Sequence, residues 1–215
     1  MLTTQNNNHT FKKSAQYRKW LKLYRPQFDA INNFHIFIDK CVKADNRVNM
    51  ILNRGERLIK LADKSRFSSL KIFFLLVCVE SIMRISDGKE YKIGISQKSI
   101  VNFCESNFCE GDKKFFENSF KNLLCKNCDN ENLSFEEIIK YFYKIRCKLV
   151  HNGKYWGFCW GGDRVDSVNS CYYENEEGIK KDYLVVKSGV GYQQIKVAFV
   201  RAIINAVNNL FSSKR

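Results

Sequence analysis

Arg146 and His151 are the residues whose types and spacing could do chemistry. A guanidinium is a permanent cation whose planar fork matches a phosphate group. An imidazole titrates near neutral pH and can accept or donate a proton. Only four residues separate the two in the segment SFEEIIKYFYKIRCKLVHNGKYW, residues 134–156. Together they could stabilise negative charge on a phosphodiester and move the protons that its cleavage requires.

An amphipathic helix is expected to position this pair. Ser134 followed by Glu137 is typical of a capping box at a helix start. At 100° per residue, Arg146 falls about 40° from Phe142, inside the apolar stripe of that helix. The guanidinium should therefore point toward protein, so it needs an acidic partner or lines a pocket or an interface.

The end of the same helix is expected to carry the imidazole. Asn152-Gly153 follows His151 directly and is a strong C-terminal stop signal. The helix dipole favours the charged form of an imidazole at that position, which would tune a proton-transfer group.

Residues 66–85, RFSSLKIFFLLVCVESIMRI, contain eight consecutive apolar residues. A strand fits such a run, but the length of the segment favours a helix that is buried almost all round. Glu80 follows this run and needs a salt bridge or hydrogen bonds if it is buried. Arg146 is the obvious cation for it, and Arg84 is a local competitor four residues further on.

The run from Arg146 to Gly153, RCKLVHNG, resembles the R-x4-H motif of the HEPN superfamily (higher eukaryotes and prokaryotes nucleotide-binding domains). That motif typically reads R-N-K-L-x-H-G at the end of a long helix. The stretch VCVESIM, with Glu80, resembles an earlier helix of the family in which an acid recurs. The resemblance extends over roughly residues 63–211. The chain departs from the family at Cys147, where Asn, Asp or His usually helps to build the site.

The resemblance implies a metal-independent endoribonuclease without a cofactor, in which two copies place their R-x4-H pairs across a dimer groove. Arg146 would stabilise the phosphate and His151 would transfer protons, with Asn152 and Glu80 in supporting roles. Members of that superfamily often serve phage defence or toxin–antitoxin growth arrest, so the resemblance implies such a role. Two alternatives are a non-catalytic helical module that binds nucleic acid or a partner protein, and a nuclease silenced by an antitoxin-like partner.

The formal charge of +14 on 215 residues is high. Such a charge attracts RNA, an anionic membrane surface or an acidic protein, although Lys and Arg are spread along the whole chain. Neither a phosphate-binding glycine loop nor an HExxH metalloprotease motif is present.

Two segments could contact RNA directly. The helix expected at 11–25 has a basic face with Lys12, Lys13, Arg18 and Lys19. This face could bind phosphate groups, or it could simply be exposed to solvent. Lys148 shortly before the histidine, and Lys154, Tyr155 and Trp156 after it, combine charge with aromatic rings. These rings could stack on bases, or they could fill the core beside a hairpin.

Nine cysteines, no signal-peptide pattern and no membrane-length apolar run favour a reduced, cytoplasmic protein with no membrane partner. Four of these cysteines could bind zinc, but the first pair converges poorly on a helix and reduced, mostly buried thiols explain them better: Cys104, Cys109, Cys125 and Cys128.

The expected fold is all-α with one small β-hairpin near residues 163–189. Hydrophobic residues make up 45% of the chain, enough for a substantial core. Residues 1–62 are expected to form a basic helical extension, with two helices broken near residues 44–46, and residues 63–215 a HEPN-like helical domain. Further helices are expected at about 97–106, 112–124 and 191–211.

Overall fold

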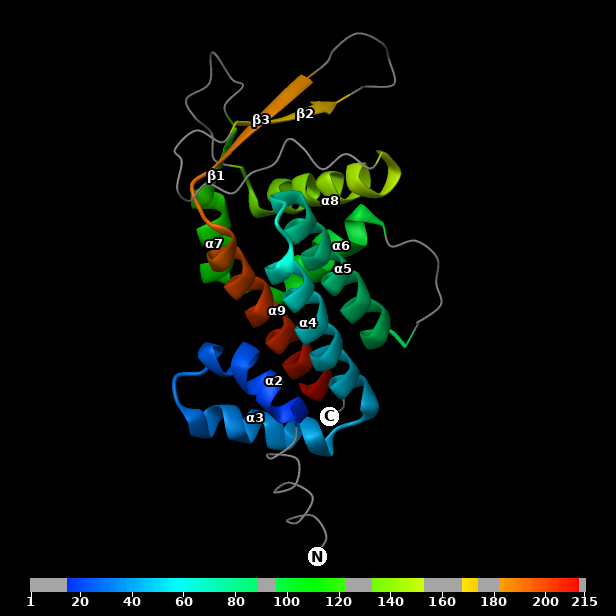
Figure 1. The fold of residues 1–215 in the computed structure, drawn as a ribbon, viewed down its shortest axis with the longest axis vertical. Coiled ribbons are helices and arrows are strands. Elements are labelled where there is room, and N and C mark those ends of the chain that lie inside the picture. The colour runs from blue at the N-terminus through cyan, green and yellow to red at the C-terminus, as the bar shows by residue number, and fades with distance from the viewer. Residues whose placement is uncertain (1–14, 89–95, 123–132, 153–167, 174–181, 213–215) are drawn as a thin grey trace, which may run out of the picture.

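The computed structural model describes residues 15–88, 96–122, 133–152, 168–173 and 182–212, and it is mostly helical (Figure 1). The prediction of a mainly helical fold is therefore confirmed for these ranges. The elements in chain order are α2 (Ala15–Tyr24), the 3₁₀ helix η1 (Arg25–Gln27), α3 (Ile31–Lys43), α4 (Asn46–Lys64), α5 (Ser68–Ser86), α6 (Gln97–Asn107), α7 (Glu110–Ser119), β1 (Phe120–Asn122), α8 (Phe135–Asn152), β2 (Val168–Tyr173), β3 (Asp182–Ser188) and α9 (Tyr192–Ser212).

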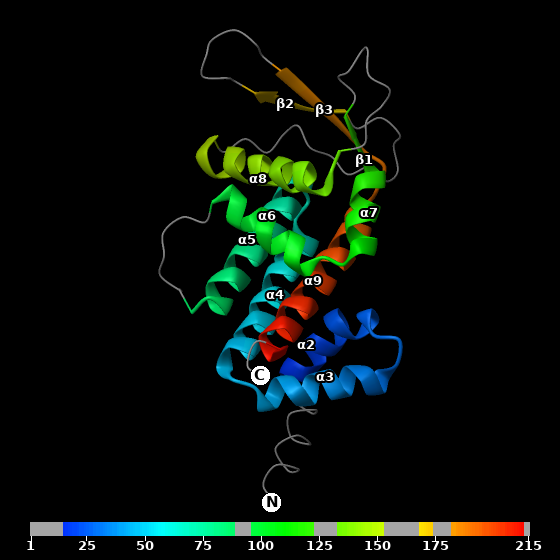
Figure 2. The same ribbon diagram turned by 180° about the vertical axis from the view of Figure 1, so that it is seen from behind.

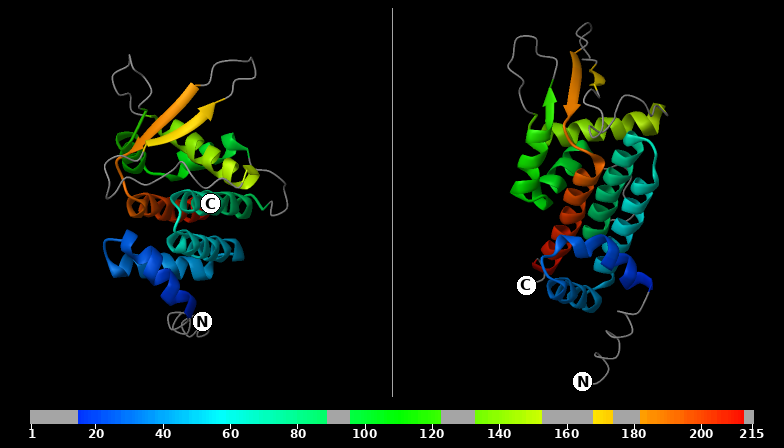
Figure 3. Two further views of the ribbon diagram at one scale, coloured as in Figure 1. Left: turned by 45° about the horizontal axis from the view of Figure 1, so that its top comes forward. Right: turned by 60° about the vertical axis from the view of Figure 1, so that its left-hand side comes forward.

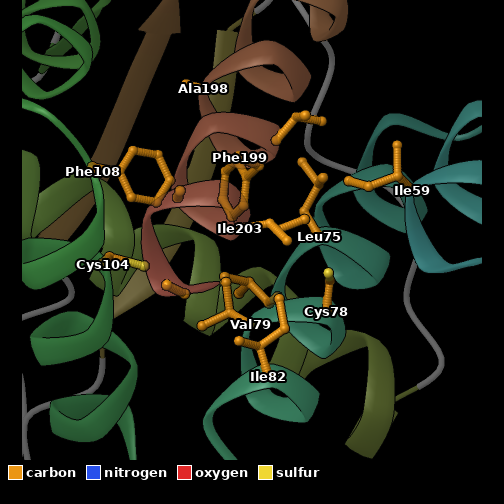
Figure 4. Close-up of a cluster of buried hydrophobic side chains, with 14 of the residues drawn as sticks. Ile59, Leu75, Cys78, Val79, Ile82, Cys104, Phe108, Ala198, Phe199 and Ile203 are labelled. Atoms are coloured by element: carbon orange, nitrogen blue, oxygen red, sulfur yellow. The ribbon is translucent and has the colours of Figure 1, made fainter. Parts of the chain in front are cut away.

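Helix α5 occupies the centre of the bundle and packs against α4, α6, α8 and α9. Its apolar residues extend around the helix, so neighbours can cover it on several sides. Figure 4 shows Leu75, Val79 and Ile82 of α5 close to Phe199 and Ile203 of α9 in the hydrophobic core. The helical, buried interpretation of residues 66–85 is confirmed.

Helices α2 and α4 approach each other closely. The Tyr24 hydroxyl donates to the Leu52 carbonyl oxygen at 2.8 Å, and the Trp20 indole donates to Asn53 at 3.1 Å. A Cβ at Gly55 would lie 2.6 Å from the Tyr24 hydroxyl oxygen, so only glycine allows this crossing. The aromatic face of α2 is therefore part of the common core rather than a separate unit.

The boundary expected at residue 62 falls inside α4, which is continuous from Asn46 to Lys64. Both α4 and α2 contact α9 at the other end of the chain. Residues 15–62 thus share one hydrophobic cluster with the residues that follow them. The break expected near residues 44–46 is present, where Asp45 caps α4 by accepting from the Arg47 backbone N–H at 2.9 Å.

Three strands form an antiparallel sheet in the order β1-β3-β2, with Phe120 opposite Ser188 and Cys171 opposite Leu184. Residues 174–181 lie outside the described residues, so the hairpin between β2 and β3 stays a prediction. The helix expected at 112–124 ends earlier, at Ser119. The reason is long-range, because the Ser119 carbonyl accepts from Gly189 at 2.8 Å and β1 pairs with β3.

Helix α8 lies across one end of the bundle, and α2 and α3 lie at the other end (Figure 1). Seen from behind, α6 and α7 lie on the face opposite α4, and both contact α8 (Figure 2). Within the described ranges, no helix combines the length and apolarity that crossing a membrane would require.

Candidate functional site on α8

The sequence of α8 fixes its start and its buried face. Ser134 and Glu137 form the predicted capping box, with the Ser134 backbone N–H donating to Glu137 at 2.9 Å and the Glu137 N–H donating to the serine hydroxyl at 3.3 Å. The apolar stripe is buried, namely Phe135, Ile138, Ile139, Phe142, Ile145 and Leu149. The structure describes the helix as far as Asn152, and the stop predicted at Gly153 lies outside the described residues.

Arg146 extends from this buried side of α8 to Glu80 on α5. Its Nη2 lies 3.0 Å from Glu80 Oε1 and donates to Oε2 at 3.1 Å. The Arg146 side chain is 22% exposed, against 10% for the Glu80 side chain. The ion pair expected from the sequence is therefore present, at the edge of the core rather than sealed within it.

Only Glu80 Oε2 accepts a hydrogen bond from this nitrogen of Arg146, because the buried Oε1, although 3.0 Å away, has no hydrogen-bond partner among the described residues. The Nε of Arg146 is buried and finds no hydrogen-bond acceptor within the described ranges. The Nε of Arg84, one turn along α5 from Glu80, is also buried and has no hydrogen-bond acceptor within these ranges. Two buried guanidinium donors and one buried carboxylate oxygen therefore lack hydrogen-bond partners around Glu80 within the described ranges.

Tyr143 and Cys147 complete the surroundings of the guanidinium. The Arg146 Cζ lies 5.8 Å from the centre of the Tyr143 ring. Burial alone would lower the pKa of Arg146, but the Glu80 carboxylate and a hydrogen bond with Cys147 raise it, so the group stays cationic. Burial, and then the contact with Cys147, raises the pKa of Tyr143, which keeps the phenol neutral.

His151 lies in the last turn of α8 and is exposed. Five residues along a regular helix separate it from Arg146 by about 140° and about 7.5 Å along the axis. The two side chains of one copy therefore leave the helix in different directions. Val150 beside the imidazole is also exposed, which leaves an apolar side chain at this helix end.

The structure brings only part of the predicted site together. Glu80 lies with Arg146, and Lys148 is half-buried on the same helix. Asn152 is the last residue of α8. Arg18 and Lys19 are exposed on α2, at the opposite end of the bundle from α8 (Figure 1). The remaining RNA-binding candidates lie outside the described residues, namely Lys12, Lys13, Lys154, Tyr155 and Trp156.

Of the four cysteines proposed as zinc ligands, the structure describes only two. Cys104 is fully buried and burial raises the pKa of its thiol, which opposes the thiolate that zinc requires. Cys109 instead caps α7 and donates to Asp112 at 3.1 Å. Cys125 and Cys128 lie outside the described residues, and within those residues no cluster of three or more metal-binding side chains is present.

Two features of the charged interior were missed at the level of sequence. One is the position of Tyr143 beside the guanidinium, which helical spacing from Arg146 could have indicated. The other is a second ion pair, between Arg201 on α9 and Asp112 on α7. The signal in the sequence is an arginine directly flanked by the apolar residues Val200 and Ala202.

Comparisons of the chain with protein-family models, with curated proteins and with solved structures find no match. Membership of the HEPN superfamily stays a prediction that depends on the R-x4-H run and the acid at Glu80.

Proposed function

We propose that this protein is a metal-independent endoribonuclease in which two copies combine their Arg146 and His151 side chains at a dimer cleft. One observation carries the proposal. The guanidinium of Arg146 contacts Glu80 through a single nitrogen at a partly exposed edge of the core, its Nε has no acceptor among the described residues, and an exposed imidazole follows on the same helix end.

The chemistry uses the substrate's own nucleophile. The ribose 2′-oxygen attacks phosphorus as its proton leaves, the bond from phosphorus to the 5′-oxygen breaks, and that oxygen takes a proton. The products are a 2′,3′-cyclic phosphate and a 5′-hydroxyl. His151 moves one of these protons, and the Arg146 guanidinium stabilises the charge that grows on the phosphoryl oxygens. Neither step requires a metal ion.

The need for two copies follows from helix geometry. Side chains about 140° apart on one helix diverge, so a shared phosphate is reached more easily by the arginine of one copy and the histidine of another. A twofold axis near the end of α8 would bring both into one cleft. The exposed Val150 gives that end an apolar contact.

The first experiment measures cleavage of a structured RNA in EDTA by the wild type and by the Arg146→Ala and His151→Ala variants. Each variant should lose at least about 100-fold in rate. Lys43→Ala is the matched control, because Lys43 is exposed at the end of α3, which lies at the opposite end of the bundle from α8 (Figure 1). Loss of wild-type cleavage on chelation would refute the metal-free mechanism.

Mixing the two inactive variants tests whether the site is shared. If Arg146 of one copy works with His151 of the other, each mixed dimer contains one intact site. Random exchange of subunits should then restore about a quarter of the wild-type activity. If both residues act from the same copy, the mixture stays inactive.

A non-catalytic helical module is the second candidate, and the Arg146–Glu80 pair favours it. This pair joins α8 to α5, so the motif could be present for packing alone. The module would bind nucleic acid or a partner protein through its basic faces. The binding module is identified if the wild type and both variants bind RNA equally and none of them cleaves it. The purified wild type must then be free of an antitoxin-like partner, because such a partner would silence a nuclease.

Roles in phage defence or in toxin–antitoxin growth arrest, in the cytoplasm, are part of the first proposal. They follow from the resemblance of RCKLVHNG to the family motif. Growth arrest on expression of the wild type, but not of His151→Ala, is the expected observation.

A further inference from the structure

Four cations share the solvent-exposed face of α4, which we name the α4 stripe: Arg54, Arg57, Lys60 and Lys64. At 100° per residue these positions fall within an arc of about 120°. All four residues are exposed, whereas the opposite side of α4 is buried against its neighbours. The stripe follows one face over about three turns of helix, or roughly 15 Å.

None of these four cations takes part in an ion pair or a side-chain hydrogen bond with a described residue. Elsewhere the described cations often have acids: Lys113 contacts Glu105 and Glu110, and Lys196 contacts Asp63. The two acids of α4, Glu56 and Asp63, lie outside the arc of the stripe. Like charges three and four residues apart on a helix repel each other. A bound anion would therefore reduce the repulsion among the four cations of the stripe.

We infer that the α4 stripe binds the phosphate backbone of single-stranded RNA, a role that rests on RNA being the substrate class proposed above. Four cations on one helix face can contact several consecutive phosphates of a single strand. Two of the four are arginines, whose planar forks match phosphate oxygens better than lysine does. The surface is charged and unpaired, and a polyanion is the partner that it complements.

The stripe is placed where it could extend the α8 site. In the right-hand view of Figure 3, α4 runs along the same side of the molecule on which α8 ends. Figure 1 likewise shows the C-terminal end of α4 approaching the level of α8. A strand that follows α4 toward its C-terminus is thereby led toward the helix that carries Arg146.

An exposed aromatic ring favours a single strand over a duplex. Phe67, three residues beyond the end of the stripe, is 58% exposed, and Leu61 within the same face is also exposed. The flat face of a phenylalanine ring stacks on an unpaired base whatever the sequence. A duplex keeps its bases stacked inside and offers no such contact.

The test compares two fourfold variants in a His151→Ala background, so that binding is measured without cleavage. The stripe variant is Arg54→Gln/Arg57→Gln/Lys60→Gln/Lys64→Gln. The control replaces four cations that are equally exposed and have no ion pair with a described residue: Lys40, Lys43, Lys98 and Lys114, each to Gln. Both lower the formal charge of +14 by four, and glutamine keeps a helix propensity close to that of lysine and arginine.

Fluorescence anisotropy with a labelled single-stranded oligoribonucleotide gives Kd over a series of salt concentrations. The stripe variant should bind at least about tenfold more weakly at 150 mM salt, and its log–log salt slope should fall by about 3. The control should keep the slope within about 1 of the parent. Equal losses in both variants, or no loss in the stripe variant, overturn the inference.

The outcome separates this inference from the proposed function. Cleavage by the wild type together with an unaffected stripe variant rejects the stripe and keeps the nuclease. Stripe-dependent binding without any cleavage keeps the stripe and rejects the nuclease. Circular dichroism spectra that coincide show that both fourfold variants are folded.

Discussion

Within the part of the chain that the structure describes, two arginine–carboxylate pairs join different helices, and they differ in how the arginine uses its nitrogens. Arg201 on α9 grips Asp112 on α7 through two nitrogens, Nε at 3.0 Å from Oδ2 and Nη2 on Oδ1. Arg146 on α8 holds Glu80 on α5 through Nη2 alone. The first is a bidentate fork, which fixes orientation as well as distance, and the second is not.

The surroundings of Asp112 complete its hydrogen bonding. Cys109 donates to the same carboxylate, which is 3% exposed, and the hydrogen bond with Asp112 raises the pKa of Arg201. Nearby, Asn205 donates to the Asn107 carbonyl oxygen at 2.9 Å and reinforces the contact of α9 with α6. This region has the properties of a structural joint, in which each polar group has its partner.

The surroundings of Glu80 lack that completeness. Both nearby arginines keep a buried Nε without an acceptor within the described ranges. Glu80 Oε1 is likewise buried without a hydrogen-bond partner there, and a protein gains little stability from polar atoms left in this way. The comparison teaches that complete hydrogen bonding marks the Arg201–Asp112 pair as structural, whereas the Arg146–Glu80 pair keeps unsatisfied polar atoms, the feature on which the proposed function depends.

Replacing each arginine by lysine tests most directly whether Arg146 and Arg201 have different roles. Arg146→Lys should lower RNA cleavage by about 10²–10³-fold, because an ammonium cannot present a fork to the phosphoryl oxygens. Arg201→Lys should leave cleavage within a few-fold while it lowers stability. Initial rates and urea unfolding of both variants give the two readouts, and equal effects on cleavage would remove the distinction.

Truncation of the same two residues compares their stabilising effects. Arg201→Ala leaves the buried Asp112 carboxylate uncompensated and should lower the free energy of unfolding by about 3 kcal/mol. Arg146→Ala should cost only about 1–2 kcal/mol, because Arg84 can take over the Glu80 carboxylate from the next turn. Urea denaturation followed by circular dichroism measures both, and the reverse order would contradict the comparison.

The smallest expected effect comes from neutralising the carboxylates. Glu80→Gln releases Arg146 from its ion pair and should strengthen RNA binding by about threefold, or about 0.6 kcal/mol. Asp112→Asn should leave RNA binding unchanged, because Arg201 is not part of the proposed site. Anisotropy titrations in the His151→Ala background test this pair, and a gain in Asp112→Asn alone would reverse the assignment.

Local patterns in the sequence predicted much of the helical framework. The Ser134–Glu137 capping box, the break before Asn46 and the burial of α5 are all present as expected. These features depend on residues within a few positions of one another, where helix periodicity and capping chemistry are fixed by type and spacing. The prediction that one helix continues to residue 124 was wrong, because the helix ends at Ser119. Its end depends on pairing with a strand almost seventy residues away.

The sequence by itself determined that an inward-facing guanidinium near the end of α8 needs an acid, and that Glu80 needs a cation. It left two arginines competing for that carboxylate, since either satisfies the same local rule. Tertiary structure alone decided that Arg146, 66 residues away, makes the contact through one nitrogen, and that Arg201 finds Asp112 across 89 residues. The physical reason is that periodicity gives the direction of a side chain, whereas the packing of α8 on α5 and of α9 on α7 sets which atoms come within hydrogen-bond distance.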